Sequence, residues 1–326
     1  MIEEQESKWI EWLDGVIKKW SPINPREVLV SGQCLSMEAC PNNPEADELY
    51  VEMLSEANLD AIDVYLWPGL VTRYEERYNN LIKEIRRHGK KLILGYQMLP
   101  RRHRLGRVSF RFEPYFKRPP TYDEFISLEL KLTRKYIQRY KPYLYWVVVE
   151  PGTNEMRLGV KFTSEQWRHL VSETCRLVKK ISPETLTGAA VFHYEYVRPF
   201  ADVPELDVLG HDLYRRSELD EFEHLVALAR RVRKEAWLAE TWASLASSPR
   251  FDQPHRSIID SRWLKATFNL AQSRGLIGMN IWFTTHFVAY IPIKDQADYE
   301  RRFVKALKAG ERTKVFEAVS ELRRAS

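Results

Sequence analysis

The chain has few of the features that mark specialised classes of protein. Among its 326 residues are only 3 cysteines and 13 glycines, and no apolar run approaches the about 18 residues that a membrane span requires. There is no GxGxxG or GxxxxGK[ST] motif, which argues against an open doubly wound sheet with a phosphate-binding turn. The cysteines are too few for a disulfide framework, and no CxxC or His/Cys spacing indicates zinc.

The remaining cysteine and charge patterns are also unremarkable for a folded domain. We expect Cys34, Cys40 and Cys175 to be buried thiols, with a Cys34–Cys40 bridge as the alternative if the source is a hyperthermophile. The formal net charge of +5 is modest and its basic residues are interspersed with acidic ones, so nucleic-acid binding does not follow.

The N-terminus is acidic and amphipathic where a secretory signal is basic and then apolar. A cytoplasmic protein is expected, although a processed mature form would have the same sequence.

Short β-branched runs alternate with longer segments of helical periodicity. Hydrophobic residues make up 44% of the chain and charged residues 29%, which supplies a large core. Eight runs have the length and composition of strands: 27–33, 60–66, 91–97, 144–150, 186–192, 206–212, 235–240 and 276–283. The run at 144–150 is apolar without alternation, as a parallel sheet covered by helices requires.

The helical segments between these runs carry recognisable ends. Capping boxes at 121–124 and 163–166 open two long helices, and Gly89 and Gly275 stand where helices should end before the third and eighth strands. Eight strands in alternation with helices, in a chain of this length, predict a single (β/α)8 barrel covering residues 1–326.

Both ends of the chain extend beyond the eight repeats. An apolar stripe from Trp9 to Trp20 predicts an extra N-terminal helix, which we expect to close the bottom of the barrel. From about Tyr299 onward the sequence predicts the eighth helix and one extra C-terminal helix.

In a (β/α)8 barrel the active site is built from residues at the carboxyl ends of the strands. The sequence places carboxylates after the fourth and seventh strands, Glu155 and Glu240, with tryptophans nearby. Hydrolysis of a glycosidic bond needs two carboxyl groups, and sugar rings stack on flat aromatic side chains. Further candidate substrate-binding residues at strand ends are Gln33, Trp67, Tyr96, Glu150, Asn154, His193, His211, Tyr214, Trp242 and Trp282.

These motifs resemble the clan of retaining (β/α)8 glycoside hydrolases that includes many cellulases, mannanases and β-galactosidases. The resemblance covers the barrel in order and rests on Asn154-Glu155, Tyr214 in GHDLY, Glu240 in AWLAETW and Trp282 in NIWF. It implies that Glu155 is the acid/base and that Glu240 is the nucleophile of a double displacement. It also implies that Asn154 binds the sugar 2-hydroxyl and that Tyr214 orients Glu240.

The chain departs from the clan pattern in two places. Glu150 lies nearer the end of the fourth strand than Glu155, so Glu150 is the alternative acid/base. Many clan members carry an arginine at the end of the second strand, where this chain has Tyr65-Leu66-Trp67-Pro68. Electrostatic support for the nucleophile is then expected from His211 or from an arginine of the following loop.

The loop at 98–120 is long, basic and aromatic. Its cations, Arg101, Arg102, Arg104, Arg107, Arg111, Lys117 and Arg118, are interleaved with phenylalanine and tyrosine. On the catalytic face such residues favour an anionic substrate, because arginine matches the geometry of carboxylate and phosphate. A solvated loop or a subunit contact is the alternative interpretation.

Two other functions fit a barrel with these strand ends. A metal-dependent hydrolase is one alternative, since His193, His211, Asp212 and His286 also follow strands, but no His-x-His follows the first strand. A barrel that binds a glycan or a protein without turnover is the other. The preferred hypothesis is a glycosidase that needs neither cofactor nor metal, with a carbohydrate as its partner.

Overall fold

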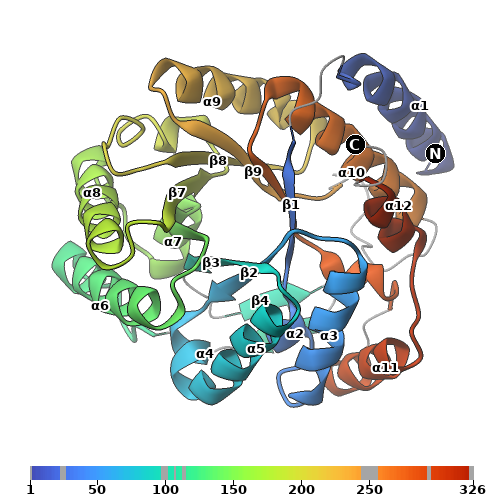
Figure 1. The fold of residues 1–326 in the computed structure, drawn as a ribbon, viewed down its shortest axis with the longest axis horizontal. Helices are drawn as coiled ribbons and strands as arrows, with labels where there is room; N and C mark the ends of the chain where they lie inside the picture. Colours follow the sequence, from blue (N-terminus) through green and yellow to red (C-terminus); the bar gives the residue numbers. More distant parts are fainter. Residues whose placement is uncertain are drawn as a thin grey trace.

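The computed structural model describes residues 2–22, 27–96, 102–105, 108–111, 115–243, 256–291 and 295–322. Eight parallel strands close into a barrel in the order β1-β10-β9-β8-β7-β6-β3-β2 (Figure 1). They are β1 (Leu29–Gln33), β2 (Ala61–Leu66), β3 (Lys91–Tyr96), β6 (Leu144–Val149), β7 (Leu186–Val191), β8 (Val208–Leu213), β9 (Glu235–Thr241) and β10 (Gly278–Ile281). Each lies within a predicted strand or within one residue of it, so the predicted fold is confirmed.

Most of the helices surround the barrel on the outside (Figure 1). They are α2 (Ser36–Ala39), α3 (Glu45–Glu56), α4 (Pro68–Arg73), α5 (Glu75–Arg87), α6 (Tyr122–Tyr140), α7 (Pro151–Leu158), α8 (Ser164–Ile181), α9 (Leu219–Arg231), α10 (Ser257–Arg274) and α11 (Gln296–Lys308). Thr121 and Thr163 form the predicted capping boxes at the starts of α6 and α8. Gly89 and Gly275 both take φ 69°, the left-handed conformation expected of glycine after a helix.

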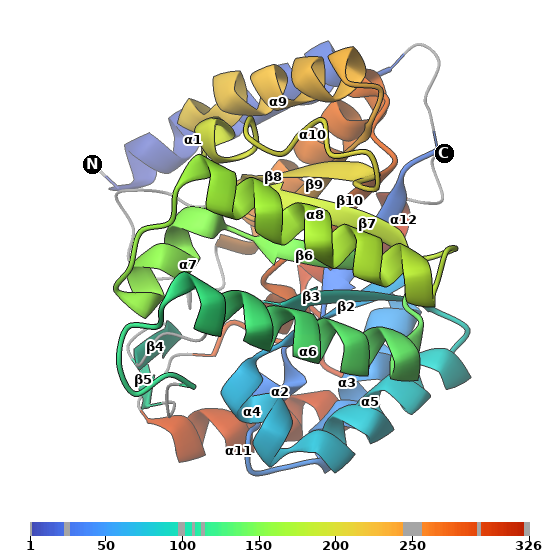
Figure 2. The same ribbon diagram turned by 90° about the vertical axis from the view of Figure 1, so that its left-hand side faces the viewer.

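Two connections differ from the regular alternation. Between β7 and β8 the chain forms only the 3-10 turn Tyr194–Tyr196, so the fifth unit lacks the helix that the pattern predicts. After β3, the segments β4 (Arg102–Leu105) and β5 (Val108–Arg111) pair antiparallel within the loop that the sequence marks as long. Figure 2 shows β4, β5 and α7 at the same end of the barrel, which is the end where the strands finish.

Tryptophans and a polar layer fill the barrel interior. Trp146 of β6 and Trp237 of β9 meet edge to face, with ring centroids 6.1 Å apart. Asn280 of β10 donates a hydrogen bond to Asp63 of β2 over 3.3 Å and accepts one from Ser31 of β1 over 3.1 Å. These three polar side chains are fully buried. The interior is therefore a packed core, and only its carboxyl end is available for a site.

The extra terminal helices are present, but the first does not close the barrel. The helix α1 (Ile2–Trp20) lies along the outside of α10 (Figure 1), where Trp9 and Trp12 pack within 5.8 Å and 6.4 Å of the Trp263 ring. The prediction that it covers the bottom of the barrel is wrong, because its apolar stripe meets a neighbouring helix. At the other end α12 (Lys314–Leu322) follows α11 as expected.

The cysteines and the helix lengths bear on two further expectations. Cys34, Cys40 and Cys175 are all buried and free, so the structure has no Cys34–Cys40 bridge. Among the helices that the structure describes, none combines the length and the apolar composition needed to cross a membrane.

Candidate active site

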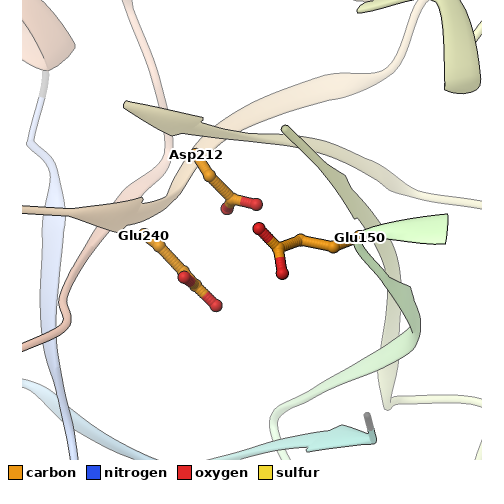
Figure 3. A group of neighbouring side chains, drawn as sticks. All are labelled: Glu150, Asp212 and Glu240. Carbon is orange, nitrogen blue, oxygen red and sulfur yellow. The ribbon is translucent and has the colours of Figure 1, made fainter. Parts of the chain in front are cut away.

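Three carboxylates converge at the carboxyl end of the barrel. Glu150 follows β6, Asp212 lies on β8 and Glu240 lies on β9, and one oxygen of each lies within 4.8 Å of the other two. Figure 3 shows the three side chains pointing toward one another from separate strands. Asp212 is fully buried and Glu240 is 3% exposed. This group is the chemical centre of the candidate site.

Local irregularities aim two of these side chains inward. The register of β6 against β7 shifts between Trp146 and Val148. The register of β8 against β9 shifts as well, because His211 pairs with Leu238 whereas the next residue, Asp212, pairs with Glu240. A bulge of this kind turns the following side chain toward a different face. Glu150 also has φ 46° and ψ 71°, a left-handed conformation that is costly for a residue with a side chain. The backbone is therefore distorted at the two positions where carboxylates enter the barrel mouth.

Two tyrosines hold Glu240. The hydroxyl of Tyr65 donates to Oε1 and the hydroxyl of Tyr214 donates to Oε2, each over 2.5 Å. Burial raises the pKa of Glu240 to about 8 and the negative charge of Glu150 adds to it, while the two tyrosine hydrogen bonds lower it. Burial also raises the pKa of Asp212 well above its usual range, with the charges of Glu240 and Glu150 adding to the effect. Carboxylates this close cannot all be ionised, so the cluster retains a proton near neutrality.

A cation from α7 faces the carboxylates. The guanidinium of Arg157 lies 6.0 Å from the centre of the Trp67 ring. Burial lowers the pKa of Arg157, and the negative charges of Glu150 and Glu240 oppose that change. Among the described residues, this electrostatic support comes from Arg157 of α7 and not from His211. Support from an arginine of the loop at 98–120 stays a prediction, because most of its side chains lie outside the described residues.

Aromatic rings lie beside Glu240. The Tyr65 ring lies 5.6 Å from Trp67 and 5.0 Å from Trp282 between centroids. The indole N–H of Trp67 donates to Glu38, which fixes that ring. Three of the predicted residues, Trp67, Tyr214 and Trp282, are thus brought together near the carboxylates.

Asn154 and Glu155 lie elsewhere. In α7, Oε1 of Glu155 accepts hydrogen bonds from the indole of Trp167 over 2.9 Å and from the backbone N–H of Phe162 over 3.0 Å. Its Oε2 accepts one from the Tyr196 hydroxyl over 3.2 Å. The amide of Asn154 donates to the carbonyl of Val149 over 2.8 Å. The structure therefore places Glu150, the alternative, opposite Glu240, because α7 begins directly after Glu150 and carries Glu155 away.

Other predicted residues also face away from the carboxylates. His211 is fully buried 6.0 Å from Phe222 of α9, and burial lowers its pKa to about 4. Tyr96 is directed to the helix side of β3, where burial raises its pKa well above its usual range and the charge of Glu129 adds to the effect. Trp242 packs 5.4 Å from His286.

The remaining predicted positions have other surroundings. Gln33 is fully buried at the end of β1, in register with Asp63. His193 is exposed and lies 3.6 Å from a carboxylate oxygen of Glu221.

Most side chains of the basic loop lie outside the part of the chain that the structure describes. Arg101 and Arg107 lie outside the described residues, and only the backbone of Arg102, Arg104 and Arg111 is described, in β4 and β5. Arg118 forms an ion pair with Glu124, the acidic residue of the capping box of α6, over 2.5 Å. One of the seven cations therefore stabilises a helix start.

Two site residues, Tyr65 and Arg157, were not among the candidates from the sequence, and Asp212 was a candidate only as a metal ligand. Asp212 and Tyr65 stand at strand ends, but nothing in their neighbours distinguishes them from other polar strand-end residues. Arg157 follows the fourth strand by eight residues, and the sequence carries no signal for it because α7 folds back over the barrel mouth.

The carboxylate cluster has two chemical interpretations. In the part of the chain that the structure describes, it is also the one group of acidic, histidine or cysteine residues spaced to hold a metal ion. A set of oxygen ligands would suit Mg²⁺ or Ca²⁺. Both oxygens of Glu240 already accept tyrosine hydrogen bonds, and Arg157 contributes a positive charge nearby. These contacts fit acid/base and nucleophilic chemistry better than a cation.

Comparisons with known proteins add structural relatives. No family model and no curated protein sequence matches the chain. A GH113 β-1,4-mannanase is 14% identical, with a TM-score of 0.59 over 92% of this chain and 99% of its own. A GH30 endoxylanase from Clostridium papyrosolvens C71 is 11% identical, with a TM-score of 0.60 over 92% and 72%. At these identities the similarity shows the shared barrel fold, and the site must be interpreted from its own residues.

Proposed function

We propose that the protein is a retaining glycosidase that cleaves a β-glycosidic bond, with Glu240 as nucleophile and Glu150 as acid/base. One observation carries the proposal: oxygens of Glu150 and Glu240 lie within 4.8 Å of each other at the carboxyl end of the barrel. Retaining enzymes separate their carboxyl groups by about 5–5.5 Å, whereas inverting enzymes need about 6.5–9.5 Å to admit a water. Glycoside hydrolysis as the reaction class is supported by two solved structures of this fold, a β-1,4-mannanase and an endoxylanase.

The chemistry then divides into two displacements. Glu150 and Glu240 share a proton near neutrality, and the reactive state is the one in which this proton lies on Glu150. In the first displacement, ionised Glu240 attacks the anomeric carbon, and Glu150 gives its proton to the departing oxygen. In the second, Glu150 removes a proton from water, which attacks the same carbon and releases Glu240. Tyr65 and Tyr214 hold both carboxylate oxygens of Glu240, so the nucleophile is oriented before substrate arrives.

Arg157 and Asp212 adjust the charge of the pair. The guanidinium of Arg157 favours the ionised form of the carboxylates that it faces. Asp212, whose pKa is raised well above its usual range by burial, holds a proton and limits the negative charge beside Glu240. The basic loop at 98–120 is the feature that favours an anionic sugar as substrate. Comparing kcat/KM for β-glucuronides with kcat/KM for neutral β-glycosides would test this preference.

A covalent trap tests the proposal directly. A 2-deoxy-2-fluoro β-glycosyl fluoride should inactivate the enzyme, and peptide mass spectrometry should find the sugar on Glu240. Substitution Glu240→Gln should abolish labelling and turnover, and both should persist in EDTA. A label on another residue, a product of inverted configuration by NMR, or complete loss of turnover in EDTA would refute the assignment, the last in favour of a metal-dependent hydrolase.

A further inference from the structure

A buried carboxylate in the connection after β1, Glu38, contacts the candidate site through a tryptophan. Glu38 lies on the short helix α2 and is 5% exposed. Its Oε1 accepts a hydrogen bond from the indole N–H of Trp67, the residue directly before α4. Glu38 is not one of the three carboxylates that converge at the barrel mouth. Any effect of Glu38 on the reaction must therefore pass through its neighbours.

An arginine of α5 fixes the segment that carries Glu38. Arg77 donates hydrogen bonds to three backbone carbonyls directly after α2, those of Cys40, Pro41 and Asn43. It also forms an ion pair with Asp47 of α3 over 2.5 Å, in which both side chains are 9% exposed. Burial raises the pKa of Glu38 to about 7 and the charge of Asp47 adds to it, while the bond from Trp67 and the charge of Arg77 lower it. Glu38 thus has a rigid support on its far side.

Trp67 connects Glu38 to the residues that hold the nucleophile. The tryptophan is 2% exposed, so its ring offers almost no surface to a substrate. The Tyr65 ring meets it at 67°, with centroids 5.6 Å apart, and the guanidinium of Arg157 lies 6.0 Å from its centre. Tyr65 donates to Oε1 of Glu240, and the charge of Glu240 acts on Arg157. A shift of the Trp67 ring would therefore displace both a hydrogen-bond donor and a cation.

We propose that Glu38 is a positioning residue of the reaction, which acts on Glu240 through Trp67. By fixing this ring, it keeps Tyr65 and Arg157 against the nucleophile. The inference rests on the function proposed above, in which Glu240 attacks as a carboxylate. A hydrogen bond to the indole N–H selects one ring orientation among the side-chain rotamers. A negative partner at that N–H also polarises the indole, which strengthens the attraction of its face for a guanidinium.

Two substitutions separate the hydrogen bond of Glu38 from its charge. In Glu38→Ala we expect kcat/KM for a 2,4-dinitrophenyl glycoside to fall about 10-fold or more, the factor that a hydrogen bond to a charged group supplies. The acid limb of the pH profile should move to higher pH, because Tyr65 and Arg157 stabilise ionised Glu240. Loss of a negative charge would by itself lower the pKa of a nearby acid, so a rise reports lost positioning. Glu38→Gln loses the same charge but keeps an acceptor oxygen, and it should restore both kcat/KM and the limb.

A double-mutant cycle tests whether Glu38 acts through the indole. Trp67→Phe keeps an aromatic ring and removes the N–H. Adding Glu38→Ala to Trp67→Phe should lower kcat/KM by less than about twofold further, whereas independent effects would multiply. Multiplied effects would overturn the inference. Glu155→Gln is the matched control, because it alters a second buried carboxylate–indole hydrogen bond, that from Trp167, and should leave kcat/KM and the limb unchanged.

The outcomes separate this inference from the proposed function. If the unmodified protein hydrolyses no glycoside, the proposed function fails, but the effect on Glu240 is still measurable by NMR titration of ¹³C-labelled glutamate carboxyl groups. The signal that Glu240→Gln lacks identifies the nucleophile, and its midpoint should move to higher pH in Glu38→Ala and not in Glu38→Gln. An unchanged midpoint in Glu38→Ala would overturn the positioning role. Equal impairment of Glu38→Gln and Glu38→Ala would also overturn it, in favour of a role for the charge alone.

Discussion

The phenol of Tyr65 donates a hydrogen bond over 2.5 Å to Oε1 of Glu240, although the two residues lie 175 positions apart in the chain. Tyr214 donates in the same way to the other oxygen. The nucleophile proposed here is therefore held from both sides by neutral donors. Such donors favour the carboxylate over the carboxylic acid, because only the ionised form accepts on both oxygens.

Removing either donor should weaken the nucleophile. We expect Tyr65→Phe and Tyr214→Phe each to lower kcat/KM about 10- to 100-fold near neutrality, because a hydrogen bond to a charged group contributes about 1.5–3 kcal/mol. Each change should also move the acid limb of the pH profile to higher pH, since the bonds hold the pKa of Glu240 down. Tyr145→Phe, which removes a buried hydroxyl bonded to Thr133, is the control. An unshifted limb in both active-site variants would show that the tyrosines do not tune Glu240.

The charge of Glu150 should act on Glu240 in the opposite direction. Glu240 attacks as a carboxylate, so kcat/KM falls as the pH drops through its pKa, which burial and the charge of Glu150 raise to about 8. In Glu150→Gln that charge is absent, so the pKa of Glu240 falls and activity extends to lower pH. A 2,4-dinitrophenyl glycoside, which needs no acid to leave, makes this limb measurable. Glu155→Gln should leave the acid limb of the pH profile at the pH of the unmodified enzyme. A shift of this limb in Glu155→Gln, with no shift in Glu150→Gln, would assign the acid/base to Glu155 in place of Glu150.

The sequence predicts the strands and helix starts because those signals are local. The apolar run at 144–150 and the box at Thr163 depend only on neighbours in the chain, and both are found where expected. The choice between Glu150 and Glu155 depends on a register shift against β7 and on a left-handed backbone at Glu150. Neither follows from local propensity, since a bulge is fixed by pairing between strands distant in sequence. The Asn-Glu pair fitted a family pattern, but one turn of α7 displaces it.

Glu155 should behave as a structural residue. Its carboxylate accepts from the Trp167 indole and from the backbone of Phe162, and Trp167 is buried. We expect Glu155→Ala to lower the free energy of unfolding by several kcal/mol, because each buried donor left unsatisfied costs about 1–3 kcal/mol. Glu155→Gln keeps one acceptor oxygen and should restore most of that loss in chemical denaturation. Turnover in Glu155→Gln should persist, whereas Glu150→Gln should lose it on substrates with a poor leaving group.

The buried acid beneath the site should make stability depend on pH. Burial raises the pKa of Asp63 to about 8, and the side chain is fully buried where it accepts from Asn280. In the unfolded chain Asp63 ionises near its ordinary pKa of about 3.9. Its contribution to stability is therefore complete below that value and is lost as the pH rises toward 8, by up to about 1.4 kcal/mol per pH unit.

Asp63→Asn removes this ionisation and should flatten the dependence. We expect the melting temperature of the variant, relative to that of the unmodified protein, to be higher at pH 8 than at pH 5. Thermal unfolding at fixed ionic strength measures both temperatures. Glu311→Gln, at an exposed position after α11, should show no such gain. The same difference between Asp63→Asn and the unmodified protein at both pH values would mean that Asp63 binds no more protons in the folded barrel than in the unfolded chain over this range, and that burial does not raise its pKa.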